Sequence, residues 1–185
     1  MKTQERIEKL LTLTGRPGIE KLIMWMDLNG FYDAPCSSKY HLAEPGGLAE
    51  HSLNVYTHAD EMAYALCKDV SNEFLHSIII CSLLHDLGKA GQFSKPNYIM
   101  QPNEETGALE YRTNKELLYI PHEVRSIAIA SKFIKLTEEE QFAILYHNGL
   151  YGELRSVKNH ETPLYMILHF ADMWASRVTE KEDTK

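Results

Sequence analysis

LLHDLGK, residues 83–89, ends an almost wholly apolar run that begins at Ile78. The run carries an imidazole and a neighbouring carboxylate, His85 and Asp86, to the edge of a predicted core. Burying such polar groups is costly unless they are paired, and a divalent metal ion would pair with both. The stretch therefore predicts a buried helix that ends at a metal site.

More residues of metal-ligating type occur on both sides of this doublet, at intervals on the scale of whole helices. They are His51 in GGLAEHSL (46–53), His122, His147 in YHNG (146–149) and Asp172 in LHFAD (168–172). A single histidine is more often an ordinary structural residue, because histidine is commonly of intermediate burial. The order and context of the whole set, rather than any one member, indicate metal binding.

This ordered set resembles the HD superfamily of metal-dependent phosphohydrolases. Its pattern is a first His, a His-Asp doublet, often two further His, and a distal Asp. The resemblance runs from about Ala34 to Ala175. It is closest to small stand-alone HD hydrolases and to the catalytic part of an HD-type 3′-to-5′ exoribonuclease, which shares the Gly-Gly-Leu-x-Glu-His start and the His-x-Gly turn. The resemblance implies an all-α helical bundle.

The resemblance also implies a cofactor of one or two divalent ions bridged by Asp86. Mixed imidazole and carboxylate sites do not select sharply by affinity, so Mn, Fe, Mg, Ni and Zn all remain candidates. Two ions would lower the pKa of a bridging water, which makes a metal-bound hydroxide the expected nucleophile. One ion would take His51, His85, Asp86 and Asp172, and the other Asp86, His122 and His147. Mononuclear relatives lack the second histidine pair.

Lys89 is predicted to act with Asp86 in catalysis, by placing an ammonium group over a substrate phosphate. The alternative is a solvated lysine after a helix end, where a cation is favoured anyway. Glu50 is expected to orient an imidazole. Further substrate contacts are predicted at Lys39, Tyr40 and His41, with Tyr40 against a base, and at Arg125. A plain polar loop is the alternative for residues 37–41.

Helical periodicity dominates the chain. A change of pattern between residues 97 and 120, where short β-prone runs flank a Gly-containing turn, predicts one inserted β-hairpin. Pro121 suits a first helical position, and Thr137 with Glu140 forms a capping box. The predicted helices lie around Ile7–Leu11 and Leu22–Met26, over Gly47–Leu66 and Asn72–Leu87, after Pro121 and Thr137, and over Thr162–Val178.

At 185 residues with 44% hydrophobic and 24% charged side chains, the chain fits one domain, 1–185. Its core is expected at residues 34–178, and the charged tail 179–185 is expected to fray. The three cysteines form no Cys-x-x-Cys spacing, and there is neither a signal-peptide pattern nor a membrane span. These features predict a cytoplasmic protein that does not associate with membranes.

A net charge of −7 disfavours long polyanions but not a small nucleotide near a metal. The sequence therefore predicts hydrolysis of a phosphoester or phosphoanhydride bond in a nucleotide. One alternative is an HD-type nuclease or phosphodiesterase acting on short single strands, cyclic nucleotides or dinucleotides. A second is a non-catalytic protein that binds metal or nucleotide. The sequence leaves open whether the chain forms a homo-oligomer.

Overall fold

Helix α4 (Asn72–Leu84) lies at the centre of the molecule because its second half is apolar on every side. All residues from Ile78 to Leu84 are buried, and a helix of this kind must be covered all round. The covering helices that contact it are α1 (Thr3–Leu13), α3 (Gly47–Leu66), α6 (Glu138–Tyr146) and α7 (Pro163–Trp174). Their buried apolar side chains form one contiguous core with those of α4.

The structure is a computed structural model that describes residues 2–92, 95–149 and 157–181. Two more helices, α2 (Ile19–Leu28) and α5 (His122–Ala130), flank the bundle. The predicted all-α bundle with an inserted hairpin is confirmed. Among the described residues, no helix is both long and apolar enough to span a membrane.

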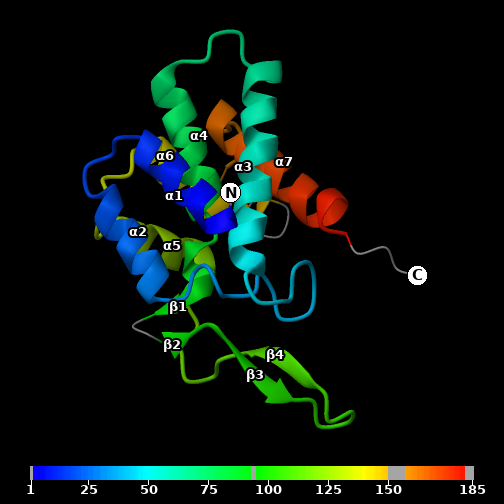
Figure 1. Cartoon of the computed structure of the whole chain (residues 1–185). Coiled ribbons are helices and arrows are strands. Elements are labelled where there is room, and N and C mark those ends of the chain that lie inside the picture. Colours follow the sequence, from blue (N-terminus) through cyan, green and yellow to red (C-terminus); the bar gives the residue numbers. More distant parts are fainter. Residues whose placement is uncertain (1, 93–94, 150–156, 182–185) are drawn as a thin grey trace.

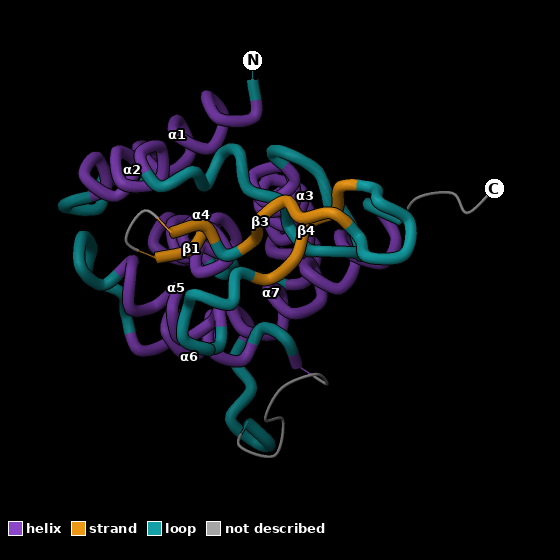
Figure 2. The backbone as a smooth tube through the Cα atoms, turned by 90° about the horizontal axis from the view of Figure 1, so that it is seen from below, coloured by secondary structure: helices purple, strands orange, loops and turns teal. Residues whose placement is uncertain are grey.

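The hairpin consists of antiparallel strands β3 (Tyr98–Pro102) and β4 (Leu109–Thr113), with Tyr98 opposite Thr113. It projects from one end of the helical bundle and, seen from that end, lies across it (Figures 1 and 2). A two-residue ladder, β1 (Gly91–Gln92) with β2 (Lys95–Pro96), precedes it and was not predicted. The strands occupy 98–113 of the predicted range 97–120.

The end of α4 differs from the predicted helix end at Leu87. The α-helix ends at Leu84, and a 3₁₀ turn, η1 (Leu87–Ala90), follows the doublet. Gly88 is required in this turn, since a Cβ there would lie 2.3 Å from the carbonyl oxygen of His122. The missing side chain lets η1 pack directly on α5, which brings His122 beside Asp86.

Other boundaries match closely. Helix α3 has the predicted limits, and Thr137 with Glu140 forms the predicted capping box at the start of α6. Pro121 is the N-cap of α5 rather than its first helical residue. The last helix starts after Thr162 as predicted, but its α-helical part ends at Trp174 and a π-helical segment, η4 (Ala175–Thr179), continues it.

Candidate metal centre

All six predicted metal ligands converge on one buried point. They come from five places in the fold: the first turns of α3, the turn after α4, the start of α5, the end of α6, and α7. Every ligand atom in each of three overlapping groups lies within 4.8 Å of the others in that group. The groups are His51, His85 and Asp86; His85, His147 and Asp172; and Asp86, His122 and His147.

Asp86 is the middle of this cluster, and its two carboxylate oxygens face different histidines. Oδ2 lies 3.4 Å from His85 Nε2 and 3.6 Å from His51 Nε2. Oδ1 lies 3.1 Å from His122 Nε2 and 3.7 Å from His147 Nε2. Each oxygen thus faces a histidine pair, as expected of a carboxylate that bridges two ions. Asp172 joins the first pair, with Oδ1 3.2 Å from His51 Nε2.

The opposite ring nitrogen of each histidine faces an oxygen acceptor. Nδ1 of His85 donates to the Ser82 carbonyl at 2.9 Å, and Nδ1 of His147 donates to the Ile144 carbonyl at 2.7 Å. His51 Nδ1 donates to the Glu180 carboxylate at 3.0 Å. His122 Nδ1 lies 3.5 Å from the Glu123 carboxylate. These acceptors assign a proton to Nδ1 of each ring, so Nε2 is the nitrogen that points into the cluster.

Lone pairs directed at a buried carboxylate repel it unless a cation lies between them. Asp86 is 1% exposed, and its Oδ1 accepts no hydrogen bond from the described residues. His147 is equally buried, and burial together with the neighbouring His85 lowers its pKa to about 3, so its imidazole is neutral. A neutral imidazole and an ionised carboxylate are the forms that bind divalent ions. The residues present therefore fit a divalent metal.

A raised pKa of His51 contributes to charge balance in the cluster without a metal. Burial opposes protonation of His51, but Cys36, Asp172 and Glu180 raise its pKa overall. Burial would also raise the pKa of Asp172, yet His51 holds it well below its usual value. A metal ion that binds here replaces the His51 proton, so binding should release it.

Glu180 orients His51, a role that the sequence predicts for Glu50. Both Glu180 carboxylate oxygens lie within 3.1 Å of His51 Nδ1, and Asn54 donates to Oε1 at 3.0 Å. Glu50 is exposed and makes no described contact with His51. The predicted fraying of the tail from residue 179 is wrong at this position, because Glu180 is only 8% exposed. Residues 182–185 lie outside the described part of the chain.

Lys89 forms an ion pair with Asp86 instead of standing free in solvent. Its Nζ lies 2.6 Å from Asp86 Oδ2, and its side chain is only 16% exposed. Burial alone would lower the pKa of Lys89, but Asp86 outweighs it and the net shift is upward. Burial would likewise raise the pKa of Asp86, but Lys89 and His85 hold it well below its usual value. The pair is therefore charged on both sides.

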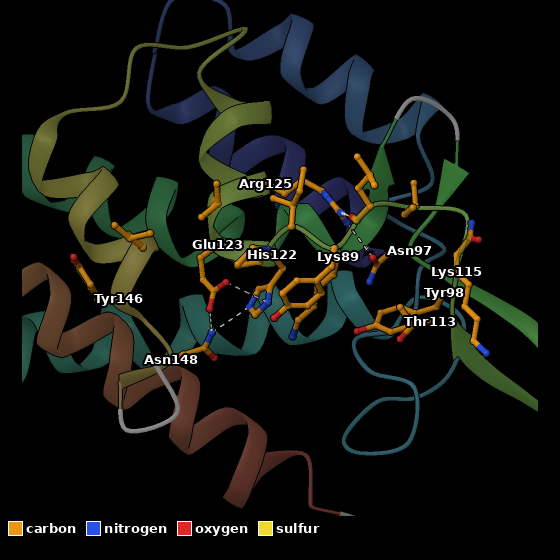
Figure 3. A pocket seen from close by; sticks show the side chains of 18 residues that line it. Lys89, Asn97, Tyr98, Thr113, Lys115, His122, Glu123, Arg125, Tyr146 and Asn148 are labelled. Atoms are coloured by element: carbon orange, nitrogen blue, oxygen red, sulfur yellow. Dashed lines mark hydrogen bonds and ion pairs between the residues drawn. The ribbon is translucent and has the colours of Figure 1, made fainter. Parts of the chain in front are cut away.

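A cleft with two lobes borders the cluster. The hairpin lobe, about 1090 Å³, lies between the hairpin, the segment 113–121, the start of α5 and the end of α6 (Figure 3). The α7 lobe, about 900 Å³, lies between the loop at Lys39–His41 and the C-terminal part of the described chain. Lys89 and Asn148 line both lobes. Four of the six cluster residues line one lobe or the other, namely His122 in the hairpin lobe and Asp86, His147 and Asp172 in the α7 lobe.

The predicted substrate residues divide between these lobes. Lys39, Tyr40 and His41 all line the α7 lobe. Arg125 lines the hairpin lobe, but its guanidinium already donates to the Gly88 carbonyl at 3.3 Å, to Asn97 at 3.0 Å and to the Leu118 carbonyl at 3.1 Å. Arg125 thereby ties η1 to the hairpin and to the segment that closes the lobe.

Comparison with known proteins adds one finding. The family model for the HD domain matches residues 48–175, more than two thirds of the chain. The chain belongs to the HD domain family. No curated protein and no solved structure gives a significant match. All six cluster residues, from His51 to Asp172, lie within the matched range.

Proposed function

We propose that this HD protein is a metal-dependent phosphohydrolase that cleaves a phosphoester or phosphoanhydride bond of a nucleotide. The observation that carries the proposal is the buried Asp86 carboxylate, which faces two histidine pairs and is ion-paired with Lys89. A non-catalytic metal site would not need a buried lysine at a cleft shared by two lobes. Phosphoryl transfer needs a cation there, because charge develops on the phosphate oxygens.

The residues of the chain have separate roles in this proposal. His51, His85, His122, His147, Asp86 and Asp172 would hold one or two divalent ions. Such ions supply an activated water and neutralise charge on the phosphate. Lys89 keeps its proton at neutral pH and donates to a non-bridging phosphate oxygen. Glu180 and the backbone carbonyls keep the imidazoles turned with Nε2 inward.

The test begins with metal content. Purified protein is analysed for metals, depleted with a chelator, and reloaded with Mn, Mg, Ni, Co, Fe or Zn in turn. Each form is assayed against nucleoside mono-, di- and triphosphates, dinucleotides and short oligonucleotides. We expect at least one ion to restore phosphate-releasing or bond-cleaving activity on a nucleotide.

Two variants assign the roles. Asp86→Asn should abolish both metal binding and turnover, because the bridging charge is lost. Lys89→Ala should retain the metal and lower kcat about 10- to 1000-fold, the scale for losing one electrostatic partner of the transition state. Absence of bound metal under every loading condition, or full activity in Asp86→Asn, would refute the proposal.

A further inference from the structure

The two lobes leave space for a bulky group on each side of the candidate metal centre. His122 borders the hairpin lobe, whereas Asp86, His147 and Asp172 border the α7 lobe. Their volumes, about 1090 and 900 Å³, are at the upper end of the size of small-molecule pockets. A phosphate at their junction has space for one substituent in each lobe.

The hairpin lobe has the chemistry of a base-binding surface. Tyr98, Tyr119 and Tyr146 line it, and Tyr119 is 92% exposed. In Figure 3, Tyr98 and Tyr146 lie on opposite sides of His122. Aromatic faces of this kind stack nucleobases without strong sequence preference. This lobe thus suits a nucleoside attached to the reacting phosphate.

The α7 lobe has the chemistry of a second nucleotide site, one that suits a negatively charged ligand. Lys39, Arg177 and Lys181 line its exposed rim, and Tyr40 beside them is 82% exposed. Its three carboxylates, Asp86, Asp172 and Glu180, all face His51 rather than the rim. Three cations gathered on one rim of a protein with net charge −7 favour a ligand that carries a further phosphate.

We propose that the substrate is a short linear phosphodiester, of dinucleotide to few-nucleotide length, with one nucleoside in each lobe. This inference rests on the proposed function and narrows its substrate class. A mononucleotide or nucleoside triphosphate has a single nucleoside and would leave one lobe empty. Hydrolysis breaks one P–O ester bond and forms a P–O bond to the water oxygen. The departing hydroxyl gains a proton, and the acidic surface disfavours long strands.

The test compares substrates that differ in the number of nucleosides. The metal-loaded protein is assayed with a 5′-phosphorylated diadenylate, AMP, ATP and a 20-nucleotide adenylate. We expect kcat/KM for the dinucleotide to exceed those for AMP and ATP at least tenfold, and that for the long strand to be lower. Products are identified by mass spectrometry, which should show cleavage at the internal diester rather than release of the 5′-phosphate.

A variant in the hairpin lobe tests the stacking surface. Tyr119→Ala removes an exposed ring, so the fold should be retained. Loss of one base-stacking contact should lower kcat/KM for the dinucleotide about 5- to 150-fold, mainly through KM. The matched control is Tyr64→Ala, an exposed tyrosine of α3 outside both lobes, which should leave the value unchanged. Equal behaviour of the two variants would overturn the stacking role.

The failures of the two proposals can be told apart. Turnover of AMP or ATP without turnover of the dinucleotide would overturn the diester inference and leave the phosphohydrolase in place. If the metal-loaded protein hydrolyses none of these substrates, the diester inference is decided by binding. Titration calorimetry then measures the affinity of the chelator-treated, metal-free protein for the dinucleotide and for AMP. Binding of the dinucleotide no tighter than AMP would then overturn it, whereas binding at least tenfold tighter supports the two-lobe site.

Discussion

At the scale of single residues, each imidazole of the metal centre is oriented by the oxygen acceptor that its Nδ1 faces. His85 and His147 donate from Nδ1 to carbonyls of their own helices, three residues earlier in the chain. These two rings are fixed by local backbone, whereas His51 depends on Glu180, 129 residues away. The orientation of His51 is therefore the one most easily removed by a single distant substitution.

We expect Glu180→Ala to weaken metal binding about 10- to 100-fold, the usual cost of losing an outer partner of a metal-bound histidine. Affinity is measured by competition with a chromophoric chelator, so the readout does not depend on turnover. Glu180→Gln should lose less, because its amide oxygen still accepts from Nδ1. Glu50→Ala is the matched control, and an equal loss in it would contradict the role of Glu180.

The clustering of the six residues was predictable from the sequence and the position of Glu180 was not, for a physical reason. The His-Asp doublet after an apolar run, the His-x-Gly turn at His147 and the Ala-Asp pair at Asp172 are local signals. Their order along the chain is what links them to one site. Glu180 lies in a run of charged residues that resembles a solvated tail. Only the π-helical continuation of α7 turns its carboxylate back onto α3, and no periodicity in the sequence indicated that turn.

At the scale of elements, a buried ion pair joins three parts of the bundle. Arg16, between α1 and α2, makes two hydrogen bonds to Glu140 of α6, at 2.7 and 2.9 Å. Ser77 of α4 donates to the same carboxylate at 2.8 Å. Glu140 is also the capping residue that the sequence predicted. Its link to Arg16 was not predictable, because the two residues are 124 positions apart.

We expect Arg16→Ala to destabilise the protein by about 3–5 kcal/mol, since it leaves a buried carboxylate without its cation. Urea denaturation measures the change. Lys95→Ala is the control: its pair with Glu116 is exposed, at 53% and 73%, and such pairs contribute about 0–1 kcal/mol. A comparable loss in both variants would contradict the assigned role of the buried pair.

The ion pair between Arg16 and Glu140 also makes the stability of the fold depend on pH. Burial would raise the pKa of Glu140, but Arg16, Thr137 and Ser77 hold it below its ordinary value. The unfolded chain then binds more protons on the acidic side, so the pair's contribution is complete above the unfolded pKa of about 4.3. It is lost as the pH falls through the lower folded pKa. The acid dependence of stability should therefore be smaller in Arg16→Ala.

At the scale of the whole molecule, the metal centre joins helices that are far apart in the chain. The residues that could hold the metal come from α3, the turn after α4, α5, α6 and α7, and they gather around the buried carboxylate of Asp86. The all-α architecture was predictable because apolar periodicity sets each helix. The cleft was not, since it depends on how the hairpin and the segment 113–121 cover one end of the bundle.

Metal binding should therefore stabilise the entire fold, because a ligand that binds only the native state adds its binding free energy to folding. At 100 times Kd this is about 2.7 kcal/mol, or about 5–11 °C in Tm for a chain of this size. Scanning calorimetry with and without chelator measures the shift. Asp86→Asn should abolish the Tm shift, whereas His147→Ala should retain the part of the shift that is due to an ion at His51 and His85. The control is His160→Ala, which changes an exposed histidine outside the cluster and should keep the full shift. An undiminished shift in Asp86→Asn would mean that the stabilising ion binds elsewhere.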